Sequence, residues 1–147
     1  MTVDPPPVAR VTRRFSAAPE RVFDAWLNPR LIGTWMFGPA FRDEEVVHIV
    51  NEPRVGGTFS FLVRRQGQDV DHVGEYLEID RPRRLVFTWG VVAPKTDMSR
   101  VVIEIVPLET GCELTLAHEM HPDWGHFADR AAEAWGRMLD ALAAALG

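Results

Sequence analysis

The sequence predicts an α+β domain in which a curved antiparallel sheet of about seven strands wraps around one long C-terminal helix. Three observations lead to this prediction. Stretches with an apolar residue at every second position recur along the chain, and most are joined by short turns. Two short helical stretches interrupt the strands near the N-terminus. The final residues carry a broad apolar helical face, the only large apolar surface available to cover one side of the sheet.

The N-terminal residues predict a short lead-in and a first strand. Residues 1–7 are polar and rich in proline, so we expect a flexible lead-in to a single domain over residues 8–147. Val11 and Phe15 alternate with Thr12 and Arg14, which predicts a strand over Val8–Phe15.

Two short helices are expected after this strand. Ser16 or a neighbouring residue is a suitable cap, and Pro19 suits a first helical turn. This first helix ends at Asn28–Pro29, where a second short helix follows over Leu31–Trp35. Gly38–Pro39 ends the second helix.

Six more strands are predicted between these helices and the C-terminal helix, in a meander with short connections. Gly56–Gly57 allows a sharp bend, a turn is expected near Gln66, a loop contains Pro94, and Glu109–Gly111 is a tight turn. The predicted strands cover Val46–Val50, Thr58–Arg65, Val73–Ile79, Leu85–Trp89, Arg100–Val106 and Glu113–Met120.

The last helix is predicted to open at Pro122–Asp123 and to reach Leu146. About 23 residues of helix are roughly 35 Å long, enough to cross a small domain. The apolar face consists of Trp124, Phe127, Ala128, Ala131, Trp135, Met138, Leu139, Leu142 and Leu146.

Composition and charge exclude several classes of function. The chain of 147 residues has a net charge of −5, which argues against a nucleic-acid-binding protein. Cys112 is the single cysteine, so an intramolecular disulfide is impossible, and we expect a reducing compartment. The N-terminus lacks a signal-peptide pattern, and no apolar run approaches the length of a membrane span. A cytoplasmic location is therefore expected.

An ordered set of motifs resembles the SRPBCC (START/Bet v 1-like) superfamily, and within it the single-domain bacterial proteins similar to the C-terminal domain of the activator of Hsp90 ATPase. The motifs are Phe15–Pro29, Leu31–Pro39, Pro53–Phe61, Gly74–Trp89, Thr110–Glu119 and Ala134–Leu146. The chain departs from the family pattern at Ala134, often a glycine there, and at Met36, in place of an aromatic residue. The resemblance implies the helix-grip fold and an internal cavity, but no single activity.

The aromatic residues predict where the cavity lies. The chain has 5 Trp and 8 Phe but only one Tyr, so its aromatic surface is strongly apolar and suits either a packed core or a pocket wall. We expect the pocket between the middle of the last helix and Trp35–Phe37. The expected lining is Phe23, Trp26, Trp35, Met36, Phe37, Phe59, Phe61, Tyr76, Phe87, Trp89, His118, Met120, Phe127, Ala131, Trp135 and Met138.

Two polar residues are candidates for a role in this cavity. His118 shares a strand face with Leu114 and Leu116, which points it inward. Tyr76 would either orient a ligand with its hydroxyl or fill the core with its tip toward solvent. Both are weak catalytic candidates, and Glu104 would join them if it faced inward.

Other chemical motifs point to structural roles. The segment His118–His126 contains three histidines and two carboxylates, but strand geometry turns His118 and His121 to opposite faces, so no metal site is expected. Cys112 lies beside the acidic Glu113, which disfavours a thiolate nucleophile. The serines lack a nucleophile context. No cofactor is expected.

Three functions are compatible with these residues. The first is non-catalytic binding of a small hydrophobic ligand between the sheet and the last helix. The second is a cyclase or dehydratase type of enzyme that uses His118 and Tyr76 for proton transfer. The third, implied by the family resemblance, is an Hsp90 co-chaperone, which ranks below the other two. A homodimer through a sheet edge or the short helices is also compatible with the pattern.

Overall fold

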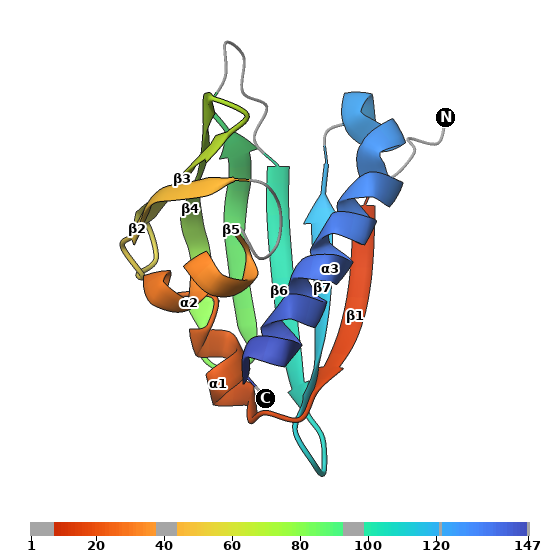
Figure 1. Ribbon diagram of the computed structural model, residues 1–147. Helices are drawn as coiled ribbons and strands as arrows, with labels where there is room; N and C mark the ends of the chain where they lie inside the picture. The colour runs from red at the N-terminus through yellow and green to blue at the C-terminus, as the bar shows by residue number, and fades with distance from the viewer. Residues whose placement is uncertain (1–7, 38–43, 93–98, 121, 147) are drawn as a thin grey trace, which may run out of the picture.

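The computed structural model describes residues 8–37, 44–92, 99–120 and 122–146, and it has the fold class that the sequence predicts. Seven antiparallel strands form one curved sheet in the order β1-β7-β6-β5-β4-β3-β2, with a long helix across its concave face (Figure 1). The strands are β1 (Val8–Phe15), β2 (Glu45–Asn51), β3 (Thr58–Arg65), β4 (Gln68–Asp80), β5 (Arg84–Val91), β6 (Ser99–Pro107) and β7 (Cys112–Glu119). The expected lead-in, the Gly38–Pro39 stop and the Pro94 loop lie outside the described residues.

The hairpin between β3 and β4 explains why β4 begins earlier than predicted. Gln66 and Gly67 both have positive φ angles, 53° and 77°, as a two-residue hairpin turn requires. The ladder therefore starts immediately with Arg65 opposite Gln68. The polar residues at the start of β4 hide this extension from the apolar pattern.

Two short helices, α1 (Pro19–Asp24) and α2 (Pro29–Trp35), connect β1 to β2. Pro19 lies in the first turn of α1, as expected, and α2 begins at Pro29, two residues before its predicted start at Leu31. The cap of α2 is Asn28, whose side chain accepts a hydrogen bond from the Arg30 backbone N–H. The residue that precedes α1 is Ala18 rather than Ser16, and it has no side-chain cap.

The predicted last helix consists of two parts. Pro122–Phe127 forms a 3₁₀ helix, and the α-helix proper, α3, covers Ala128–Leu146. The prediction of one helix from Pro122 was therefore wrong for its first turns. Gly125 lies in this segment, and glycine is a poor α-helix former, while 3₁₀ turns are common at helix N-termini. No helix among the described residues is both long and apolar enough to span a membrane.

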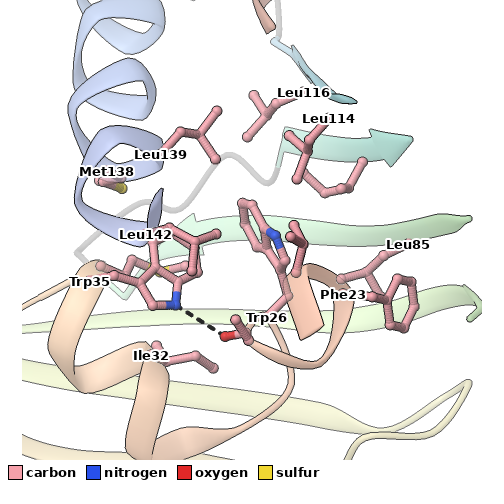
Figure 2. Packing of buried hydrophobic residues seen from close by; sticks show 14 of the residues in the cluster. Phe23, Trp26, Ile32, Trp35, Leu85, Leu114, Leu116, Met138, Leu139 and Leu142 are labelled. Carbon is pink, nitrogen blue, oxygen red and sulfur yellow. Dashed lines mark hydrogen bonds between the residues drawn. The ribbon is translucent and has the colours of Figure 1, made fainter. Parts of the chain in front are cut away.

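The core lies between the concave face of the sheet and the helices. Figure 2 shows Leu114 and Leu116 of β7 facing Leu139 and Leu142 of α3, and all four side chains are fully buried. Helix α3 lies along β1 and also contacts α2. Burial of such side chains contributes about 1.5–3 kcal/mol each, so this layer holds the helix on the sheet.

The outer face of the sheet carries exposed ion pairs. Arg84 contacts Glu78 at 2.6 Å and Glu104 at 3.1 Å, and Arg100 contacts Glu119 at 3.2 Å. Glu104 therefore faces solvent and does not join the interior polar residues. Exposed pairs of this kind contribute little stability individually.

Candidate functional site

Aromatic side chains from three layers meet in the interior of the grip. Trp89 of β5 lies 5.4 Å from Trp135 of α3 and 5.9 Å from Phe59 of β3, measured between ring centroids. Trp135 lies 6.0 Å from Trp26, which follows α1. The sheet, the short helices and α3 therefore each supply part of one aromatic wall.

The two halves of α3 fill the interior to different degrees. In the C-terminal half, Leu139 and Leu142 are fully buried. The N-terminal half presents the small residues Ala131 and Ala132, which are only partly buried. Trp89 also remains partly exposed although its ring contacts point into the interior. Of the three indoles Trp26, Trp89 and Trp135, only Trp89 is not fully buried.

The structure fills the region where the pocket was expected first. Trp35, Met36 and Phe37 are at most 1% exposed. The Trp35 ring packs edge-on against Trp26, with centroids 4.7 Å apart, and its Nε1–H donates to the Ala25 carbonyl oxygen at 3.1 Å (Figure 2). These side chains form core beneath the aromatic wall.

The remaining residues of the predicted lining fall into two groups. Most are buried in the core or on its margin, and a smaller group is partly buried toward the start of α3. The buried group consists of Phe23, Phe59, Phe61, Tyr76, Phe87, His118, Met120, Trp135 and Met138. The partly buried group consists of Phe127 and Ala131.

His118 faces inward, and both of its ring nitrogens are hydrogen-bonded. Trp135 Nε1–H donates to Nδ1 at 3.1 Å, so Nδ1 is the acceptor and the ring proton lies on Nε2. Nε2 in turn donates to Ser99 Oγ at 2.6 Å, and the Ser99 hydroxyl donates to the Trp89 carbonyl oxygen at 2.8 Å. This polar chain connects α3, β7, β6 and β5.

Burial and this hydrogen-bond network keep the His118 ring neutral. Burial lowers the pKa of His118 from its ordinary value of 6.5 to about 4. A second ring proton would also have to be placed on Nδ1, where the Trp135 N–H already points. The contact with His118 gives Ser99 a histidine neighbour that the sequence alone did not indicate. The contact does not activate Ser99, because Nε2 carries a proton and cannot accept one.

Tyr76 has a different hydrogen-bond environment. Its hydroxyl oxygen accepts from Asn51 Nδ2 at 3.0 Å, and Asn51 also donates to the Leu27 carbonyl oxygen at 2.9 Å. Burial raises the pKa of Tyr76, and the hydrogen bond from Asn51 opposes that shift. This pair links β4, β2 and the turn after α1.

The two catalytic candidates do not converge. Tyr76 pairs with Phe87, Phe87 with Val101, and Val101 with His118 along one row of the sheet. Two strands thus separate the candidates, so their backbones lie about 14 Å apart at the usual strand spacing. Each side chain is also hydrogen-bonded to a separate set of groups.

His72 is an inward polar residue that the sequence analysis missed. It is 7% exposed, its ring lies 4.7 Å from that of Phe37 and 5.4 Å from that of Trp89, and Nδ1 donates to the Phe61 carbonyl oxygen at 3.1 Å. Its position four residues before Tyr76 on one strand was the available signal, because residues at even spacing share a face.

A second serine–histidine contact lies among the outward residues of β2, β3 and β4. Ser60 Oγ donates to Asp71 Oδ1 at 2.6 Å and lies 2.9 Å from His48 Nε2. Because a carboxylate only accepts, the Ser60 proton is committed to Asp71, and His48 acts as the donor to Ser60. This arrangement joins the strands and does not create a nucleophile.

One buried polar atom in the interior lacks a partner. Among the buried side-chain nitrogens and oxygens of the described residues, only Trp26 Nε1 makes no hydrogen bond. Trp26 is 3% exposed and packs against Trp35, Phe87 and Trp135. A buried donor without an acceptor costs about 1–3 kcal/mol, so such atoms require an explanation.

Within the described residues, no group of three His, Cys, Asp or Glu side chains is arranged to hold a metal ion. His121, part of the histidine-rich segment His118–His126, lies outside the described residues.

A shallow groove of about 190 Å³ lies at the β2–β3 edge. Its polar residues Asn51, Glu52 and Ser60 are already hydrogen-bonded to the protein, so the groove offers little to a ligand.

The arrangement of a curved sheet around a long helix defines a helix-grip protein, and comparison with known families makes the assignment specific. The family model for "Activator of Hsp90 ATPase homolog 1-like protein" matches residues 16–147. The chain belongs to this family. A search of curated proteins found no match.

Solved structures of similar bacterial proteins share the fold. Protein CV1439 from Chromobacterium violaceum is 28% identical, with a TM-score of 0.81 over 95% of this chain and 96% of that chain. Protein NE0264 from Nitrosomonas europaea is 18% identical, with a TM-score of 0.79 over 96% and 94% of the two chains. Protein MLL2253 from Mesorhizobium loti is 23% identical, with a TM-score of 0.73 over 92% and 93%.

Proposed function

We propose that this protein binds a small hydrophobic molecule between the sheet and α3, without catalysing a reaction on it. The observation that carries the proposal is Trp89, an inward-facing indole that keeps exposed surface beside Trp135. An apolar ligand that covers this surface gains burial of aromatic area. Ala131 and Ala132, in the N-terminal half of α3, are small side chains that are only partly buried against the same core.

The polar groups of the interior support binding over chemistry. His118 has both nitrogens engaged, and its Nε2 is a donor that cannot act as a base toward a substrate. Tyr76 is held by Asn51 and lies on β4, which β5 and β6 separate from β7. A cyclase or dehydratase would need two such groups on one substrate, so the enzyme alternative loses support.

The binding test uses N-phenyl-1-naphthylamine, an uncharged fluorophore whose emission rises in apolar surroundings. We expect saturable enhancement with the wild-type protein and roughly tenfold weaker binding by Trp89→Ala, because a stacking surface is removed. Val106→Ala is the matched control, since Val106 is an exposed apolar residue of β6 at 57% exposure. No saturable signal from the folded wild-type protein would contradict the proposal, as would equal weakening by both variants.

The family description supports a second candidate, activation of an Hsp90 ATPase. The test is the ATPase rate of the host's Hsp90 homologue with and without this protein at equal concentration. An increase that the ligand-site variant Trp89→Ala retains would favour the co-chaperone role, because that role does not require the interior. An unchanged rate together with no pull-down of the homologue would dispose of it.

A further inference from the structure

We infer that the ligand is an uncharged, largely aromatic or aliphatic molecule that presents one carbonyl-type oxygen to the Trp26 Nε1–H. This inference rests on the proposed ligand-binding function and adds the chemical class and orientation of the ligand. It starts from the single buried donor that the protein itself leaves unpaired among the described residues.

The other indoles for which hydrogen bonds are described are already satisfied. Trp35 donates to the Ala25 carbonyl oxygen, and Trp135 donates to His118. These two donors have no proton left for a ligand, because each indole carries one N–H. Trp26 therefore differs from both neighbours, although all three rings belong to the same cluster.

The Trp26 ring lies at the inner end of the aromatic wall, and its Nε1–H is buried there. Trp26 contacts Trp135, and Trp135 contacts the partly exposed Trp89. A ligand that enters beside Trp89 would thus have its apolar body against Trp89 and Trp135. Its acceptor oxygen would face Trp26, where the hydrogen bond forms away from water and is correspondingly selective.

The charges around the interior favour a neutral ligand. Of the described cations, Arg13 is paired with Asp140 at 2.9 Å and Arg65 with Glu44 at 2.8 Å. His118 is held neutral by its two hydrogen bonds, and His72 beside Trp89 already donates its Nδ1–H to the Phe61 carbonyl oxygen. A carboxylate ligand would lose its hydration without gaining a counter-charge, whereas a carbonyl oxygen loses little and gains one hydrogen bond.

The test compares three ligands of matched shape, namely 2-ethylnaphthalene, 2-acetylnaphthalene and 2-naphthoate, by displacement of N-phenyl-1-naphthylamine. With the wild-type protein we expect 2-acetylnaphthalene to bind roughly tenfold tighter than 2-ethylnaphthalene, the factor expected for one buried hydrogen bond, and 2-naphthoate to bind weakest. In Trp26→Phe, 2-acetylnaphthalene and 2-ethylnaphthalene should bind with equal affinity. Trp35→Phe is the matched control and should keep the tenfold ratio, because the N–H of Trp35 is bound to Ala25.

A measurement on the wild-type protein covers the case in which Trp26→Phe does not fold. In a ¹H–¹⁵N spectrum, the Trp26 indole proton should move downfield on addition of 2-acetylnaphthalene and not on addition of 2-ethylnaphthalene. An indole proton already shifted upfield, as expected over the face of a neighbouring ring, and unmoved by either ligand would overturn the inference.

The outcomes separate the inference from the proposed function. If neither the fluorophore nor any naphthalene binds, the ligand-binding function itself is wrong. If the fluorophore binds but ethyl and acetyl compounds compete equally, or 2-naphthoate binds best, binding stands and the role of Trp26 is refuted.

Discussion

Acidification should weaken this fold through His118, and replacement by glutamine isolates the effect. The amide of His118→Gln can accept from the Trp135 N–H and donate to Ser99, as the neutral imidazole does, but it does not titrate. The variant therefore retains the hydrogen-bonding roles while removing the proton equilibrium.

The sign of the pH effect on stability follows from which state, folded or unfolded, binds a proton on His118 more readily. Below pH 6.5 the unfolded chain protonates His118, while the folded protein resists protonation until the pKa of about 4 is reached. The unfolded state thus binds more protons between these values, and the free energy of unfolding falls as pH decreases. Relative to pH 7, the loss from this one residue is about 2 kcal/mol at pH 5 and about 3 kcal/mol at pH 4.

The assay is urea unfolding of the wild type and His118→Gln at several pH values from 7 to 4. Other groups titrate in both proteins, so the two proteins are compared by how steeply the free energy of unfolding changes with pH in each. His126→Gln, which replaces an exposed histidine, is the control and should follow the wild type. If His118→Gln loses stability with acid in parallel with the wild type, the argument from the buried neutral ring is refuted.

Four further predictions concern packing and the polar chain. Gly74→Ala should destabilise by about 3 kcal/mol in urea unfolding, because a methyl group there overlaps the Thr88 carbonyl oxygen. Gly136→Ala should change stability by less than about 1 kcal/mol, since the closest group to its methyl is the flexible end of the Arg13 side chain at 2.8 Å, and Val11 lies at ordinary contact distance. Leu142→Ala should cost about 3 kcal/mol in the same assay, as expected for a fully buried leucine. Trp135→Phe should reduce the acid sensitivity of unfolding, because Nδ1 becomes free to take a proton.

The sequence predicts the framework well because side-chain alternation and turn chemistry act locally. Strand β7 alternates buried and partly exposed residues without a break, and β1 was placed over Val8–Phe15 with its observed bounds. The start of β4 and the 3₁₀ segment before α3 were misplaced for equally local reasons. Polar residues hide the apolar period of β4 before Val73, and Gly125 weakens a helix that the apolar face otherwise predicts.

The candidate site was less predictable because it depends on long-range pairing. That His118 faces inward follows from its place on β7. Its hydrogen-bond partners come from β6 and from α3, and no local sequence pattern predicts either contact. The same is true of Tyr76 and Asn51, which lie 25 positions apart. The aromatic content predicted an apolar lining, but it did not show which of these side chains are packed in the core.

The contrast between three indoles follows from what each backbone places within reach. Trp35 lies over the open carbonyl at the end of α1, so its donor is satisfied by the chain itself. Trp135 faces β7 at the height of His118, and the hydrogen bond that it donates to Nδ1 fixes the tautomer of the imidazole. Trp26 lies between them against rings that offer no oxygen. The indole therefore carries the cost of a buried donor without an acceptor, and in the proposed complex the oxygen of the ligand removes that cost.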